Sequence, residues 1–248
     1  SPPLPPPAPP APPPAPPLEP TPCFGLIDLV VLLDRSGSMR AVIDGVAQFA
    51  TTLVGQFELG AQAMRVSIVS FSTSATLRLD LSDSRSAIDQ AIGDATASAY
   101  GLTCISCALD DARQQLDANA RSGAEKMVVL LTDGEQTVSG GDAAAVSAAG
   151  VLKAAGYALY AVGFGGADED TLAAMASSPA SEYAYFGATL ADVQLNFALR
   201  FCSIVVSPRA PPAPPSGPAP PLPPPCSTPP PPPFAAPTCP GGEQATLD

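Results

Sequence analysis

Residues 27–38, IDLVVLLDRSGS, contain the features that decide the fold. Residues 27–33 form an almost continuous apolar run, which is typical of a strand buried on both faces of a parallel sheet. A polar loop, Asp34-Arg35-Ser36-Gly37-Ser38, follows directly. Because ligands of such sheets bind beyond the carboxyl ends of the strands, this loop is the first candidate site.

Outward from this stretch, strand-like and helix-like runs alternate. Besides 27–33, strands are expected at 64–71, 75–81, 126–131, 157–162 and 183–186. Helices are expected at 42–57, 84–95, 107–118, 142–155, 170–176 and 190–201. This alternation predicts an α/β fold with a doubly wound, mainly parallel sheet, in which residues 75–81 form one antiparallel edge strand.

The prolines divide the chain into three parts. Of the 33 prolines, all but Pro179 lie in residues 1–22 and 203–248. Such runs favour extended polyproline II, which has no core and acts as a stiff spacer. We therefore expect proline-rich segments at 1–22 and 203–248 around one domain at 23–202. Residues 239–248 resemble the domain entry at 23–28, so the last segment is expected to lead into a further domain; the alternative is a free tail.

Charge and residue content exclude several functions. With 23 acidic and 11 basic residues the net charge is −12, which argues against nucleic acid as a partner. No apolar run reaches the 18 residues of a membrane span. The chain has no histidine, so catalysis by histidine as general acid or base is absent. We expect a binding protein and not an enzyme.

The six cysteines point to disulfides and to an oxidising, extracellular compartment. Cys23 and Cys202 stand at the two ends of the domain, where a bond would close a long loop. Cys104 and Cys107 form a C-x-x-C at a helix start, and Cys226 and Cys239 lie in the last segment without an assigned pairing. The alternatives are six reduced thiols and, for C-x-x-C, a redox-active pair.

Three loops that follow strands or precede a helix hold hydroxyls and carboxylates. They are residues 34–38, Gly101-Leu102-Thr103 and Thr132-Asp133-Gly134. Hard divalent cations prefer oxygen ligands of this kind, and Mg²⁺ keeps several waters. The alternative is that Asp34 and Ser36 only cap the following helix.

The three loops, in this order, resemble the metal-ion-dependent adhesion site of the von Willebrand factor type A domain, and the resemblance covers residues 26–201. It implies Mg²⁺, or else Mn²⁺ or Ca²⁺, as the cofactor. Ser36 and Ser38 would bind the cation directly, and Thr103 directly or through water. Asp34 and Asp133 would act mainly through water. The open coordination position would take an Asp or Glu carboxylate from an extracellular partner, with a neighbouring copy of the chain (through Glu243 or Asp248) as one candidate.

The proline tracts resemble the hydroxyproline-rich glycoproteins of plant and green-algal walls. Together the resemblances imply a secreted adhesion or matrix glycoprotein of the extracellular matrix, cell wall or cell surface. The alternative is a purely structural wall or filament subunit, in which the metal serves stability or a lattice contact. Arg35 and the acidic patches at 110–111 and 168–170 are interpreted as solvated or helix-start charges.

Overall fold

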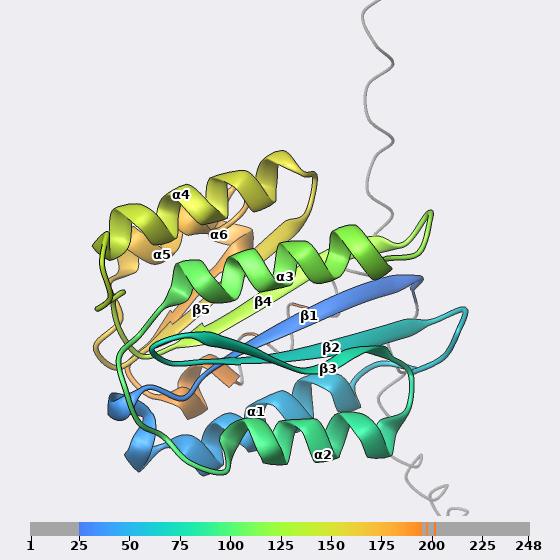
Figure 1. The fold of residues 1–248 in the computed structure, drawn as a ribbon, viewed down its shortest axis with the longest axis horizontal. Coiled ribbons are helices and arrows are strands. Elements are labelled where there is room, and N and C mark those ends of the chain that lie inside the picture. Colours follow the sequence, from blue (N-terminus) through green and yellow to red (C-terminus); the bar gives the residue numbers. More distant parts are fainter. Residues whose placement is uncertain (1–24, 195–196, 198–200, 202–248) are drawn as a thin grey trace, which may run out of the picture. The chain divides into compact units, whose positions relative to one another are not determined.

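The computed structural model describes residues 25–194, 197 and 201. Within this part of the chain, six strands form one sheet in the order β3-β2-β1-β4-β5-β6 (Figure 1). The strands are β1 Ile27–Asp34, β2 Met64–Phe71, β3 Ala75–Ser82, β4 Glu125–Thr132, β5 Ala158–Phe164 and β6 Ala184–Gly187. Among these six described strands, only β2 and β3 pair antiparallel. The expected mainly parallel sheet with one antiparallel edge strand is confirmed.

Helices cover both faces of the sheet, as Figure 1 shows. They are the 3-10 helix η1 Gly37–Ala41, then α1 Ile43–Gly55, α2 Arg85–Thr96, α3 Ile105–Asn119, α4 Gly141–Ala154, α5 Glu169–Met175 and α6 Ala180–Tyr183. One apolar cluster packs α1 and α2 against the sheet, and a second packs α3, α4 and α5 against the opposite face. Every residue of β1 is buried, because this strand lies between β2 and β4 inside the sheet and helices cover both faces of the sheet.

The strand order places the first and third candidate loops next to each other. β1 pairs with β2 on one side and with β4 on the other, so the chain reverses its direction of winding at β1. Leu33 pairs with Leu131, and the loops that follow β1 and β4 therefore leave the sheet at the same edge. This is the position at which open α/β sheets bind their ligands.

Some element boundaries differ from those expected. The helix expected from residue 42 is preceded by η1, and α3 begins at Ile105, two residues earlier than expected. Ser84 caps α2 as expected, since its hydroxyl accepts from the Ala87 backbone N–H. Gly156 follows α4 with a φ of 86°, a conformation that favours glycine at a helix end.

Several expectations concern residues outside the described part of the chain. These are the proline-rich segments, the domain boundaries at 23 and 202, the cysteines other than 104 and 107, and part of the helix expected at 190–201. Among the described residues, none of the helices has both the length and the apolar character needed to cross a membrane.

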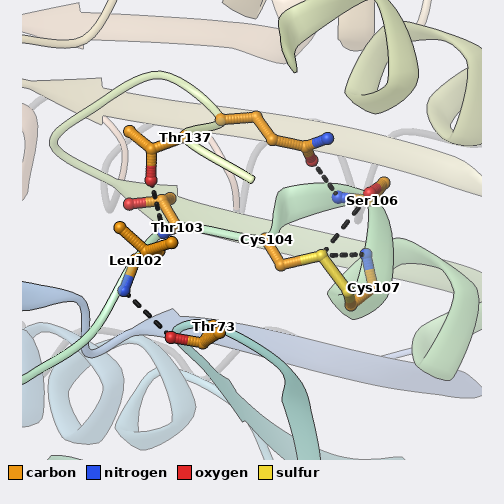
Figure 2. The surroundings of a disulfide bond; sticks show 8 residues. Thr73, Leu102, Thr103, Cys104, Ser106, Cys107 and Thr137 are labelled. Carbon is orange, nitrogen blue, oxygen red and sulfur yellow. Dashed lines mark hydrogen bonds between the residues drawn. A yellow bond between two sulfur atoms is a disulfide. The ribbon is translucent and has the colours of Figure 1, made fainter. Parts of the chain in front are cut away.

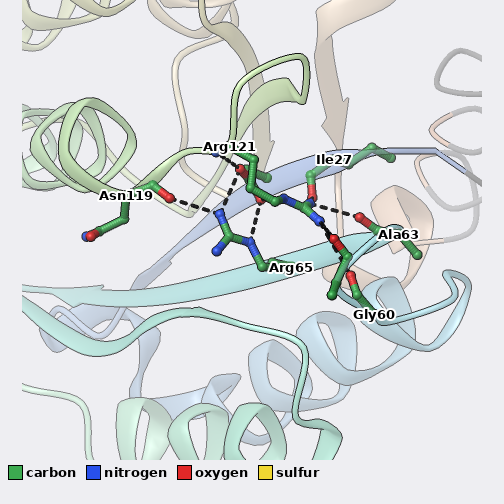
Figure 3. A network of polar contacts seen from close by, with 8 residues as sticks. Ile27, Gly60, Ala63, Arg65, Asn119 and Arg121 are labelled. Carbon is green, nitrogen blue, oxygen red and sulfur yellow. Dashed lines mark hydrogen bonds and ion pairs between the residues drawn. The ribbon is translucent and has the colours of Figure 1, made fainter.

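A buried carboxylate organises the amino end of the sheet. Asp28 lies in β1 with no exposed surface and accepts from Arg65 Nε at 2.9 Å and from Arg121 Nε at 3.0 Å (Figure 3). Arg121 also donates to the carbonyls of Ile27 and Ala63 at 2.7 and 2.8 Å. Burial acts to raise the pKa of Asp28, but the bonds and charges of the two arginines outweigh it and hold that pKa below its usual value. The network joins β1, β2 and the loop before β4.

Candidate metal site

Asp34, the last residue of β1, ties the first loop to β4. Its Oδ1 accepts from the Ser36 backbone N–H at 2.8 Å, and its Oδ2 accepts from Thr132 Oγ1 at 2.7 Å. The side chain is buried, which raises its pKa to about 6, although the bonds from Thr132 and Ser36 act in the opposite direction. A neighbouring cation would favour the ionised form of this carboxyl group.

Ser36, Ser38 and Asp133 form a continuous row of oxygen atoms. The two serine Oγ atoms lie 3.1 Å apart, and Ser38 Oγ donates to Asp133 Oδ1 at 2.8 Å. Burial raises the pKa of Asp133, and the bond from Ser38 partly offsets it. Ser36 precedes η1 without a side-chain capping bond, and Asp34 reaches across to β4. Helix capping alone therefore does not account for this loop.

The loop that contains Thr103 is hydrogen-bonded to the first loop and to the loop after β4. Gly37 N–H donates to the Gly101 carbonyl at 3.0 Å, which joins it to the first loop. Thr103 N–H donates to Thr137 Oγ1 at 2.8 Å, which joins it to the loop after β4 (Figure 2). Thr103 is buried. The structure thus links all three loops, although Thr103 is joined through backbone atoms and the other four residues through their side chains.

Gly101 allows the close approach of these loops. Its φ is 88°, and a Cβ atom at this position would lie 2.7 Å from Thr73 Oγ1. The same hydroxyl accepts from Leu102 N–H at 3.1 Å (Figure 2). A side chain at residue 101 would therefore displace the turn between β2 and β3 from the loop that it supports.

A disulfide joins Cys104 to Cys107 at the start of α3 (Figure 2). Cys104 N–H donates to the Ser72 carbonyl at 2.7 Å, and Ser106 N–H donates to Gln136 Oε1 at 2.7 Å. The bond therefore closes the helical turn that follows Thr103, while neighbouring loops hold that turn on two sides. The expected disulfide is present for this pair, and the alternative of reduced thiols is wrong for it.

Arg35 is not the solvated surface charge that we expected. It is 8% exposed, its Nη2 donates to Ser98 Oγ at 2.8 Å, and its guanidinium carbon lies 4.6 Å from the centre of the Tyr100 ring. The Arg35 carbonyl also accepts from Tyr100 N–H at 2.9 Å. Residues 98–100 cover the side chain because the loop after α2 packs along the first loop.

Sequence reasoning assigned no role to three residues at this end of the sheet, although it named Leu102 and Thr132 as members of the candidate loops. Thr132 binds the Asp34 carboxylate, Tyr100 stacks on Arg35, and Leu102 is 52% exposed beside Thr103. The signal for the last two was present, since a large apolar side chain in a loop next to a polar site is a common feature of binding surfaces.

The donor atoms fit a small divalent cation. Mg²⁺ binds oxygen at about 2.1 Å in an octahedron, so adjacent ligand atoms lie about 3.0 Å apart. The Ser36 and Ser38 hydroxyls already have this separation. Within the described residues, no three Asp, Glu or Cys side chains gather as a metal-binding group. Most donors would therefore be neutral hydroxyls, which leave a bound cation with most of its charge.

The chain is similar to proteins of one known family. The model of the von Willebrand factor type A domain matches residues 28–197. The chain belongs to this family. The chain is 27% identical to mouse matrilin-3 in an alignment of 190 positions that covers 72% of this chain and 38% of matrilin-3. It is 32% identical to the human collagen alpha-1(XX) chain in an alignment of 168 positions that covers 65% of this chain and 12% of that protein. The similarity thus covers only a part of each longer protein.

Solved structures show the same fold. Proximal thread matrix protein 1 of the mussel byssus matches with a TM-score of 0.65 and 26% identity, over 75% of this chain and 47% of that one. The same protein with a zinc-occupied MIDAS motif, the metal-ion-dependent adhesion site, matches with a TM-score of 0.63 and 26% identity, over 73% and 47%. Manganese-loaded TRAP from Plasmodium vivax matches with a TM-score of 0.58 and 19% identity, over 71% and 73%, which shows the fold alone.

The relatives narrow the class of protein. Matrilins, a collagen chain and a byssus thread protein belong to the extracellular matrix. The chain's type A domain is a module like those of the matrilins, which are not enzymes, and this family membership supports the expectation that the chain is not an enzyme.

Proposed function

We propose that the chain is a secreted adhesion or matrix module that binds a carboxylate of a partner protein through a divalent cation. Ser36, Ser38 and Thr103 would hold the cation, which is Mg²⁺ or else Mn²⁺ or Ca²⁺. Asp34 and Asp133 would act mainly through water. When bound, the cation supplies a positive charge with an open coordination position for the partner's carboxylate.

The single observation that carries this proposal is the row of side-chain oxygens from Ser36 through Ser38 to Asp133. The buried Asp34 carboxylate supports this row, because it accepts hydrogen bonds from Ser36 N–H and from the Thr132 hydroxyl on β4. The zinc-occupied motif of the byssus protein, which is 26% identical, supports the choice of a divalent cation. Its origin in a matrix, like that of the other relatives, supports an extracellular location.

Calorimetric titration with Mg²⁺ and Mn²⁺ tests whether the proposed residues bind a divalent cation. We expect Asp34→Ala and, separately, Ser38→Ala to weaken binding at least tenfold. Asp89→Ala serves as the matched control, because Asp89 is an exposed acid that pairs with Arg85 on α2. Equal affinity in all four proteins would overturn the proposal.

The proline-rich segments at 1–22 and 203–248 are proposed to be stiff spacers of the hydroxyproline-rich type. Proline fixes φ and provides no N–H donor, so these runs favour extended chain over a packed core. Mass spectrometry of the native protein should find hydroxylated and glycosylated prolines. Unmodified segments would remove this part of the proposal.

A purely structural wall or filament subunit is the alternative. Its metal would stabilise the domain or a lattice contact without binding a partner's carboxylate. The two functions differ in one measurement, since EDTA should release the partner from an adhesion module at concentrations that leave the domain folded.

A further inference from the structure

An exposed apolar rim lies beside the candidate metal site. Tyr100 is 56% and Leu102 is 52% exposed, although both belong to the loop that carries Thr103. Among the described residues only three other large apolar side chains are exposed to a comparable degree, namely Leu77, Val151 and Phe186. We call Tyr100 and Leu102 the apolar rim. Its position next to the proposed cation makes it part of the surface that a partner would contact.

The rim is held in place, with a positive charge beneath it. Tyr100 N–H donates to the Arg35 carbonyl, and Leu102 N–H donates to Thr73 Oγ1. Under the Tyr100 ring, the buried Arg35 has its Nε without a hydrogen-bond partner, and no carboxylate in the described part of the chain forms an ion pair with it. A buried guanidinium of this kind favours an anionic ligand nearby. The surface therefore combines an aromatic platform with a site for a carboxylate.

From this combination we infer the partner, and the inference rests on the proposed function. We propose that the rim binds residues 16–22, PPLEPTP, of a second copy of the chain. Glu19 provides the carboxylate for the cation, and Leu18 and Pro20 lie against Tyr100 and Leu102. Proline-rich segments bind to aromatic side chains because their extended conformation is formed in advance and loses little entropy.

The choice of Glu19 follows from the sequence. It is the only acidic residue in residues 1–22, and both Leu18 and Pro20 adjoin it. The other acids outside the domain, Glu243 and Asp248, follow Gly-Gly and Ala-Thr-Leu and have no adjacent proline. Only residues 16–22 therefore offer a carboxylate and proline side chains together.

The occupant is a second copy because of the chain's reach. The segment that contains Glu19 enters its own domain at Ile27, the first residue of β1. The candidate metal site follows Asp34, at the other end of this strand. A chain of eight residues, the separation of Glu19 from Ile27, reaches about 25 Å in polyproline II, and an eight-residue strand such as β1 has about the same length. The segment would therefore be too short to pass around the helices that cover the sheet and still reach the metal site of its own domain. The net charge of −12 opposes unspecific association between copies, so pairing would depend on the cation and Arg35.

Self-association of the full chain tests this inference. Sedimentation equilibrium in Mg²⁺ should show association that EDTA abolishes. Glu19→Gln, which lies outside residues 28–197 that match the type A domain, should weaken association at least tenfold. The double variant Tyr100→Ser, Leu102→Ser should do the same, with urea unfolding as a check of its fold. The matched controls Glu243→Gln and Leu77→Ser should change association less than twofold.

Each outcome is decisive. Association that persists in EDTA, that is lost in Glu243→Gln but not in Glu19→Gln, or that is absent at millimolar chain would overturn the inference. If calorimetry then still shows Mg²⁺ binding to the wild-type chain, the proposed function stands and only this partner is wrong. If Mg²⁺ does not bind to the wild-type chain, both the proposed function and the proposed partner are wrong.

Discussion

Asp28 and Asp34 lie near the two ends of one buried strand, in opposite environments. Asp28 accepts from Arg65 and Arg121, and its pKa lies below the usual value. Asp34 has only hydroxyl and N–H donors, and burial raises its pKa to about 6. The carboxylate without a cationic partner is the one beside the proposed metal. A carboxyl group whose pKa is raised by burial is more often found at a functional site than in a structural ion pair.

The Asp28 network should stabilise the fold in a pH-dependent way. We expect Asp28→Asn to lower the free energy of unfolding at pH 7 by about 3 kcal/mol, because it removes the partner of two partly buried arginines. The pKa of Asp28 is lowered by folding, so this stabilisation is present above the unfolded pKa of about 3.9 and is lost as pH falls through the lower native pKa. Urea unfolding at a series of pH values measures it.

The matched control is Asp89→Asn on α2. Its ion pair with Arg85 is exposed, with side chains 44% and 45% accessible, and should contribute less than about 1 kcal/mol. If Asp28→Asn were no more destabilising than Asp89→Asn, or if its effect were the same at pH 3 and pH 7, the role assigned to Asp28 would be wrong.

At the scale of elements, α5 packs directly against a glycine of β5. A Cβ atom on Gly163 would lie 2.1 Å from Leu172 Cδ1 and 3.1 Å from Ala167 Cβ, and both of these residues are buried. We expect Gly163→Ala to destabilise the domain by about 1–3 kcal/mol through overpacking. Thermal unfolding compares it with Gly150→Ala in α4, where a Cβ atom meets nothing within 4 Å.

Gly150→Ala should be neutral or stabilising by about 0.5–1 kcal/mol, because alanine favours a helix interior over glycine. Equal effects of the two substitutions would show that close packing of α5 on β5 is not what requires glycine at residue 163.

The disulfide should fix the loop that contains Thr103. The double variant Cys104→Ser, Cys107→Ser should lose about 2 kcal/mol of stability, the value that the chain-entropy model gives for so short a loop. It should also bind Mg²⁺ more weakly than the wild type, because Thr103 directly precedes the bond. Wild-type protein treated with a reducing agent should behave like the variant. Unchanged metal affinity in both would limit the bond to a role in folding.

The elements that the sequence predicted well are those with a strong local pattern. The apolar run at 27–33, the Ser84 cap and Gly156 at the end of α4 all appear in the structure. The prediction that Arg35 is solvated was wrong, because the burial of its side chain depends on residues 98–100, more than sixty positions away. The Asp28 network was missed for the same reason, although a charged residue inside a buried strand was a signal that partners must exist.

At the scale of the whole domain, the topology separates two functions along one strand. The arginine network closes the amino end of the sheet, and the candidate metal site lies at the carboxyl end, about 25 Å away by the length of β1. Three loops meet there because β1 lies between β2 and β4. The sequence could predict these loops from their motifs, whereas the hydrogen bonds that join them depend on the three-dimensional fold.

One diffraction measurement tests the central claim most directly. Crystals grown with Mn²⁺ should show an anomalous peak within direct bonding distance of Ser36 Oγ and Ser38 Oγ, with Thr103 beside it and Asp34 and Asp133 behind. A peak elsewhere on the domain, or none at a Mn²⁺ concentration that saturates the protein in solution, would contradict the account.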